Sequence, residues 1–247
     1  MCRILFTLGR LILKNTQPVF YMSRLLKILL IILISIVSLW ILGRITNTFQ
    51  YYNTPTPANE PTIKAGNKFF ASVLKTPRRF DFICFNGEVP GLGMQLRVFR
   101  LCGMSGDTVE IRNGVLFIND EAVDKKLTLS HNYLVPAPEY EKIKDKLNGT
   151  ESFFTQNASD KVTVTLTEKF VSGNHLNATR IVLPKSYADT EISKLFLHPW
   201  NQDNFGPVKV PVNHYFVLGD NRHNALDSRY TGFINKKDFV ATVLWKK

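Results

Sequence analysis

The sequence predicts a mainly β domain preceded by a single transmembrane helix. Three observations support this fold class. An uncharged run rich in Ile and Leu covers residues 28–43, many short apolar segments elsewhere are separated by Gly and Pro, and Asn113-Gly114 joins two strand-like segments. A hydrophobic content of 45% over 247 residues is enough to build a buried core, so a disordered chain is excluded.

The apolar run predicts an uncleaved membrane anchor over residues 24–44. Leu25 and Leu26 extend the run past Lys27, and about 20 apolar residues span a bilayer core of about 30 Å. No polar face interrupts the run, which argues against a buried core helix. No small-residue cleavage site follows at 43–46, which argues against a cleaved signal peptide.

Basic residues gather at the amino-terminal end. Residues 1–44 hold six of the 31 Lys and Arg residues and no Asp or Glu, so the rest carry 25 basic and 20 acidic residues, a net charge of +5. This asymmetry predicts a cytoplasmic segment at 1–23, an extracytoplasmic bulk and the lipid bilayer as a partner. No dense basic stripe with aromatic residues occurs elsewhere, so nucleic acid is not expected as a partner. The sequence leaves open whether the chain starts at Met1 or at Met22.

The chain beyond the anchor begins with a proline-containing linker and continues with short strands. Asn113-Gly114 predicts a type I′ turn inside the segment 109–118, because that turn needs positive φ values. Two short helices are expected, one at 138–147 and one that Asp189 caps and that runs to about Leu197. Further strand-like segments are apolar or β-branched and lie at 63–74, 80–85, 98–102, 162–166, 215–218 and 239–245.

The cysteines allow two interpretations. Cys84 and Cys102 lie in apolar strand-like segments, where they are either small buried hydrophobes or a disulfide that an oxidising compartment permits. Cys2 is expected in the cytoplasm. No Cys-x-x-Cys or Cys/His spacing suggests a metal site, and no metal or cofactor is expected.

A charged turn at 219–232 follows the strand at 215–218. It contains two carboxylates and two guanidinium groups, which are predicted to pair with one another because such groups are seldom buried unpaired. These four residues are Asp220, Arg222, Asp227 and Arg229. His223, in the same turn, is interpreted as a surface histidine.

This turn resembles the last conserved box of type I signal peptidases, the membrane-bound Ser/Lys serine endopeptidases of the S26 family. Segments at 60–66, 79–85, 99–109 and 200–207 are similar to other boxes of that family and occur in the same order behind the anchor. The resemblance implies a signal-peptidase-like coiled β-sheet domain over 62–247, with a smaller inserted α+β subdomain at about 121–210. It also makes 45–61 the linker and nucleophile-box region, and implies that an extended signal peptide binds by adding to a strand edge.

The resemblance places the family's catalytic groups on residues that lack the chemistry. The nucleophilic serine falls on Ala58, the general-base lysine on Phe99 and the serine that orients this lysine on Ala225. A hydroxyl remains at Thr56, the position that helps to stabilise the oxyanion. The matching scaffold positions are retained at Pro61, Thr62, Arg100, Gly103, Asp107, Gly219, Asp220, Asn221, Arg222, Asp227, Ser228 and Arg229.

Two functions follow from these substitutions. One is a non-catalytic member of the family in protein export, which binds a signal peptide or preprotein, or an active signal peptidase or export machinery. The other is an active signal peptidase with a relocated catalytic apparatus. Either form is expected in the cytoplasmic (inner) membrane as a single-pass protein with its N-terminus inside. Arg97 shares a strand face with Phe99, but a guanidinium stays protonated and cannot serve as the base.

Overall fold

The computed structural model describes residues 23–45, 48–147, 156–157 and 160–246, and both proposed start residues, Met1 and Met22, lie outside these ranges. The chain forms two compact units, residues 1–45 and 46–247. In the first unit, helix α1 spans Arg24–Ile45, and its segment Arg24–Gly43 is long and apolar enough to cross a membrane. Within the described chain, none of the helix's apolar window is buried, as expected for a helix that requires another apolar medium.

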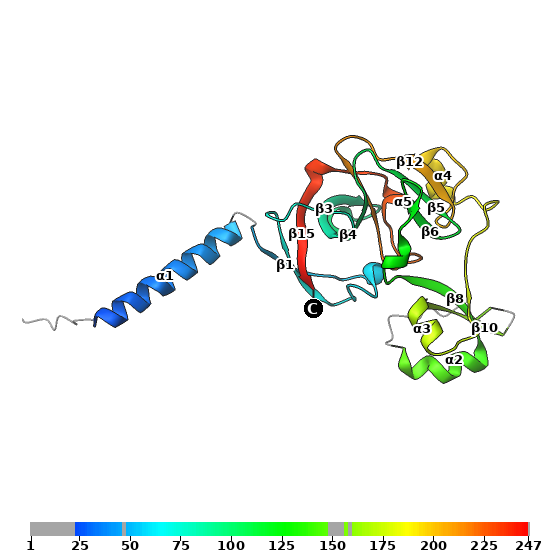
Figure 1. Cartoon of the computed structure of the whole chain (residues 1–247), viewed down its shortest axis with the longest axis horizontal. Helices are drawn as coiled ribbons and strands as arrows, with labels where there is room; N and C mark the ends of the chain where they lie inside the picture. The colour runs from blue at the N-terminus through cyan, green and yellow to red at the C-terminus, as the bar shows by residue number, and fades with distance from the viewer. Residues whose placement is uncertain (1–22, 46–47, 148–155, 158–159, 247) are drawn as a thin grey trace, which may run out of the picture. The chain divides into compact units, whose positions relative to one another are not determined.

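The second unit is built on a seven-stranded antiparallel sheet in the order β1-β2-β15-β3-β4-β13-β14. Figure 1 labels β1, β3, β4 and β15 of this sheet. Most predicted strands belong to this sheet, although the segment 63–74 is a strand only from Lys68 onward. The strands are β1 (Gln50–Asn53), β2 (Lys68–Ser72), β3 (Phe82–Val89), β4 (Gly93–Gly103), β13 (His214–Leu218), β14 (Ile234–Asn235) and β15 (Phe239–Lys246).

A second sheet contains the predicted hairpin. Strands β5 (Thr108–Arg112) and β6 (Val115–Ile118) pair antiparallel, and Asn113 and Gly114 have φ values of 49° and 73°. Both values are positive, as a type I′ turn requires, which confirms the prediction from Asn-Gly. The sheet is completed at its edges by β7 (Glu121–Ala122) and β12 (Phe205–Lys209).

A third sheet has its own apolar core. Its order is β11-β8-β10-β9, and Tyr133, Val135 and Val164 are among the residues buried between it and two helices. Figure 1 shows β8 and β10 grouped with α2 and α3. Its elements are β8 (Ser130–Pro136), α2 (Ala137–Ile143), β9 (Gln156–Asn157), β10 (Lys161–Thr167), α3 (Glu168–Gly173) and β11 (Thr179–Arg180).

This third sheet is shorter than the insertion expected at about 121–210. Strands β7 and β12, at the two ends of that segment, pair with the hairpin of the second sheet instead. Helix α4 (Thr190–Phe196) also packs outside the third sheet, with Ile192 in the core of the second. The Asp189 carboxylate accepts hydrogen bonds from the amides of Glu191 and Ile192, which confirms the predicted cap.

The charged turn connects all three sheets. Asp227 and Arg229 pair within the turn at 2.8 Å, as predicted. The prediction was wrong for the other two residues, which pair with charges far away in the sequence. Asp220 accepts hydrogen bonds from Arg100 on β4 at 2.5 and 2.7 Å, and Arg222 pairs with Asp124, in the short 3-10 helix η2 (Asp124–Lys126), at 2.7 Å. The turn is buried against β4 and η2, so Asp220 and Arg222 find their partners across the contact, while Asp227 and Arg229 pair with each other.

Cys84 and Cys102 are free and fully buried. Burial raises the pKa of each thiol to about 12, so both are protonated at neutral pH. The interpretation as small buried hydrophobes is therefore confirmed, and the disulfide alternative is not.

Arg100→Met should strongly destabilise the domain, because Asp220 would remain as an unpaired carboxylate in a nearly solvent-free position. The expected loss in free energy of unfolding is about 3–5 kcal/mol. Lys144→Gln, which breaks the exposed pair of Lys144 with Glu141, should leave the denaturation midpoint unchanged. Chemical denaturation of the full chain in detergent measures both effects.

The double variant Arg100→Met with Asp220→Leu should recover much of that loss, because it leaves no charge behind. Equal midpoints for Arg100→Met and Lys144→Gln would show that the buried pair does not stabilise the fold.

Candidate functional site

Ala58, Phe99 and Ala225 converge on one buried apolar cluster. They come from three separate segments: the short 3-10 helix η1 (Pro57–Asn59), strand β4 and the charged turn. Gly219 lies at their centre. A Cβ atom built on Gly219 would collide with Ala225 Cβ and would lie 2.5 Å from Ala58 O and 3.4 Å from Phe99 Cε1. The sequence therefore needs glycine at this point for the three segments to meet.

Two asparagines hold η1 in place. The Asn221 backbone amide donates to Ala58 O at 3.1 Å, and its side-chain amide donates to Pro57 O at 3.3 Å. The Asn59 side chain donates to Val98 O at 2.7 Å, next to Phe99 on β4. These bonds fix Ala58 relative to both the charged turn and the strand that carries Phe99.

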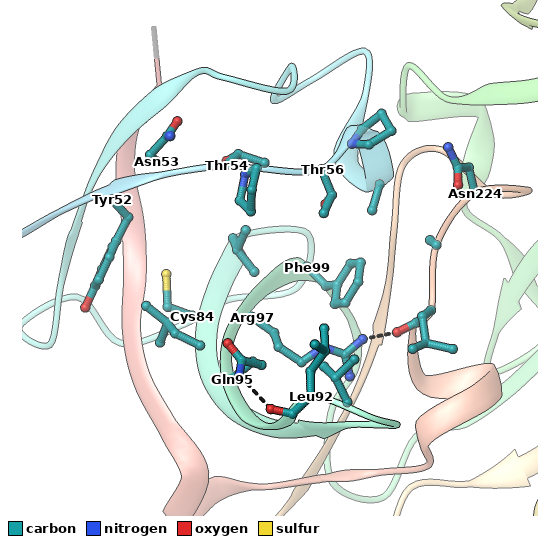
Figure 2. Close-up of a pocket in the computed structure, with 18 of the residues that line it drawn as sticks. Tyr52, Asn53, Thr54, Thr56, Cys84, Leu92, Gln95, Arg97, Phe99 and Asn224 are labelled. Carbon is teal, nitrogen blue, oxygen red and sulfur yellow. Dashed lines mark hydrogen bonds between the residues drawn. The ribbon is translucent and has the colours of Figure 1, made fainter. Parts of the chain in front are cut away.

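A cavity of about 660 Å³ opens beside this cluster (Figure 2). Its walls come from residues 52–58, from the β3–β4 hairpin and from the charged turn, and they are mainly apolar. Ala58, Phe99 and Ala225 all line it, with exposed fractions of 7%, 5% and 9%. The size and lining are typical of a pocket that binds a small molecule or part of a peptide.

Arg97 brings a cation into the wall of this cavity. Figure 2 shows its side chain next to Phe99, and its Cζ lies 5.1 Å from the centroid of that ring. Burial lowers the pKa of Arg97, although the charge of Asp227 acts in the opposite direction. The guanidinium nevertheless remains protonated at neutral pH, so it can attract an anion but cannot accept a proton.

Other polar groups near the cluster do not form a proton-transfer pair. Thr56 lines the cavity and precedes η1, but its side chain makes no capping hydrogen bond. His223 was wrongly predicted to be a surface residue, since its side chain is only 2% exposed. One ring nitrogen accepts from the Asn132 amide at 3.2 Å and the other lies 3.3 Å from an Asp203 carboxylate oxygen. Both nitrogens are therefore engaged, because the turn is covered by the start of β8 and by the loop before β12.

The scaffold residues surround the cluster and make structural contacts. The Thr62 hydroxyl accepts from Arg100 at 3.3 Å, and Asp107 pairs with Arg79 at 2.9 Å. The Ser228 hydroxyl accepts from the Val217 amide at 2.9 Å, which ties the end of the charged turn to β13. A Cβ atom on Gly103 would lie 2.7–3.0 Å from side-chain atoms of three neighbours, so glycine permits close packing there.

Sequence reasoning missed several features of this site. No sequence signal indicates the hydrogen bond from Asn59 to Val98 O. The burial of His223 was also missed, because its partner Asp203 is 20 residues away and belongs to another segment. For Arg97, the alternation along β4 correctly placed its side chain next to Phe99.

Comparison with known proteins defines the class. The family model described as "Signal peptidase, peptidase S26" matches residues 23–246. The match covers nearly the whole chain, from the apolar helix to the last strand. The chain belongs to the signal peptidase S26 family, the family of signal peptidase I.

Individual relatives agree with this assignment. The chain is 27% identical over 200 residues to signal peptidase I P of Bacillus subtilis subsp. natto, covering 79% of this chain and 75% of that protein. It is 30% identical over 165 residues to signal peptidase I S of Bacillus subtilis (strain 168), covering 66% of this chain and 55% of that protein. A solved signal peptidase I from Enterococcus faecalis V583 covers 69% of this chain and 98% of that chain at 23% identity, with a TM-score of 0.33. A TM-score of 0.33 does not establish the fold. The fold is established by the strand pairing itself.

Phe99→Lys should destabilise the protein by about 3–5 kcal/mol, because it places an ammonium group in an apolar cluster beside the Arg97 cation. Phe99→Met, which keeps an apolar side chain, should cost less than about 1.5 kcal/mol. Denaturation of the full chain in detergent measures both.

The loss caused by Phe99→Lys should be smaller at pH 10 than at pH 7. Burial lowers the pKa of the introduced lysine below its unfolded value of about 10.4. The Phe99→Lys variant therefore loses stability as the pH falls from about 10.4 towards the lowered pKa of the folded state. A loss that does not change with pH would show that the introduced amine reaches water.

Proposed function

We propose that this protein is a membrane-anchored, non-catalytic signal peptidase homologue that holds an extended apolar peptide, such as a signal peptide, without cutting it. The single observation that carries the proposal is the cluster of Ala58, Phe99 and Ala225 beside an intact cavity. In the family alignment proposed above, these positions hold the nucleophile, the base and the group that orients the base.

The chemistry of peptide hydrolysis requires a nucleophile activated by a base. Ala58 and Ala225 carry only methyl groups, and Phe99 adds an apolar ring to the same cluster. No lysine lines the cavity as the structure describes it, and Arg97 and His223 are unable to act as the base for the reasons given above. These observations support binding without cleavage over a relocated catalytic apparatus.

The cavity suits an extended apolar peptide. Strand β4 and the segment before η1 both contribute residues to its wall, and its lining is mainly apolar. An extended peptide that adds to the edge of a strand gains main-chain hydrogen bonds, and the apolar pockets beside that strand select its side chains. We propose that signal peptides or preproteins are the ligands. We also propose that an active signal peptidase or the export machinery is a protein partner of this chain.

The apolar helix α1 supports a membrane location. We propose that it anchors the chain in the cytoplasmic membrane with residues 1–23 inside and the β domain outside. Basic residues before the helix favour this orientation.

The full chain, purified in detergent, should bind a fluorescently labelled signal peptide in an anisotropy titration and should release no product from a preprotein on gels. Ala58→Trp places a large side chain in the cavity and should weaken peptide binding. Leu244→Trp, at an exposed position outside the cavity lining, should not weaken it.

Cleavage at the signal site that persists in Thr56→Ala would contradict a binding-only function. Absence of peptide binding by the parent chain would exclude the peptide-holding role. The triple variant Ala58→Ser, Phe99→Lys, Ala225→Ser tests the proposed alignment. Slow cleavage is expected only if these three positions correspond to the catalytic positions of active family members.

A further inference from the structure

Arg97 differs from the arginines that support the charged turn and β4. Its exposed fraction is 9%, yet no carboxylate in the described part of the chain lies within 4.0 Å of its guanidinium. The neighbouring arginines each pair with a carboxylate, in the pairs Arg79–Asp107, Arg100–Asp220, Arg222–Asp124 and Arg229–Asp227.

Neutral groups alone surround the Arg97 charge at close range. One terminal nitrogen donates to Leu226 O and the other to the Thr231 hydroxyl at 3.4 Å. The guanidinium carbon lies 5.1 Å from the Phe99 centroid and 5.8 Å from the Phe85 centroid. The direction of the pKa shift agrees with this environment, because burial disfavours the charged form more than the surroundings favour it.

The cavity that Arg97 lines contains no opposing charge. Among the described residues that line it, none is Asp or Glu, and Arg97 is the only Arg or Lys. The remaining walls are mainly apolar, so the field of the guanidinium is poorly screened inside the cavity. An anionic group that enters with an apolar ligand would therefore meet a positioned cation, and a guanidinium binds a carboxylate through two parallel hydrogen bonds.

We propose that Arg97 binds the C-terminal α-carboxylate of the peptide held in the cavity, so that the ligand is a peptide that a protease has already cut. This inference rests on the proposed function and names the ligand class of the same site.

The position of Arg97 favours a chain terminus over an acidic side chain. Its guanidinium lies against Phe99, whose ring lies next to Gly219 and belongs to the same buried cluster as Ala58. In an active relative the nucleophile at the Ala58 position would attack the carbonyl carbon of the peptide bond to be cut. Hydrolysis turns that carbonyl into the α-carboxylate of the amino-terminal product, so a bound product carries its new charge at this point. The apolar walls then accept the residues that precede the terminus.

Peptide binding to the full chain in detergent tests the inference with three labelled probes. They are a Leu- and Ala-rich peptide with a free C-terminal carboxylate, the same peptide with a C-terminal amide, and an amidated version with one internal Glu. The parent chain should bind the free acid about tenfold or more tightly than the amide, the effect of a charge-assisted hydrogen-bonded pair. This comparison needs no variant and so does not depend on how a substitution affects folding.

Arg97→Gln should remove the preference for the free acid over the amide, and Arg97→Lys should retain part of it. Arg78→Gln removes an exposed arginine outside the cavity lining and should keep the full preference. Denaturation midpoints show whether each variant is folded.

Equal binding of acid and amide by the parent chain would overturn the role of Arg97 while leaving the peptide-holding function intact. Tight binding of the amidated Glu peptide would overturn the assignment to the chain terminus and indicate an acidic side chain instead. Failure of the parent chain to bind any probe would overturn the proposed function itself.

Discussion

The buried pair of Arg100 and Asp220 is the constraint on which the rest of the domain depends. Arg100 is on β4 and Asp220 begins the charged turn after β13, so their 2.5 Å contact fixes the turn against the central sheet. The backbone of the same turn continues the connection, since Asp220 O accepts from the Ser130 amide where β8 begins. A charge pair this deeply buried contributes geometric specificity more than net free energy, because removing one partner costs more than the pair supplies.

The functional consequence of this constraint is the shape of the apolar cluster. With the turn fixed, Gly219 brings Ala225 and Ala58 into contact, and Phe99 fills the space beside them. A lysine at position 99 would need a hydroxyl at position 225 to satisfy its amine. With phenylalanine at position 99 there is no amine to satisfy, so alanine at position 225 leaves no polar group without a partner. In the alignment that we propose, the scaffold that would hold a catalytic pair holds an apolar cluster instead.

The fold and the site differ in how much the sequence could predict. The Asn113-Gly114 turn, the Asp189 cap and the apolar helix are local features, and local physics predicted each of them correctly. The charged turn was predicted to pair internally, but only Asp227 and Arg229 do so, because pairing across sheets depends on the tertiary contact and not on spacing in the sequence. The third sheet is shorter than the insertion expected at about 121–210, because strands β7 and β12 pair with the hairpin of the second sheet.

The buried arginines of the domain differ in whether a carboxylate pairs with them, and this difference links stability to function. Arg100, Arg222 and Arg229 each meet a carboxylate in the core, so these three structural cations are compensated by an opposite charge. Arg97 is comparably buried but faces the cavity, and no carboxylate in the described part of the chain lies within 4.0 Å of its guanidinium. Its direct contacts are a carbonyl, a hydroxyl and two aromatic rings, and the charge of Asp227 acts on it from farther away. An apolar residue there would fill the wall without the cost of desolvation. A cation left uncompensated at the wall of a cavity is a local departure from the best packing, and such departures are expected at functional sites. An anionic group on a bound ligand offsets that cost when it enters the cavity, so the ligand that this wall selects is one that carries a negative charge at the end of an apolar chain.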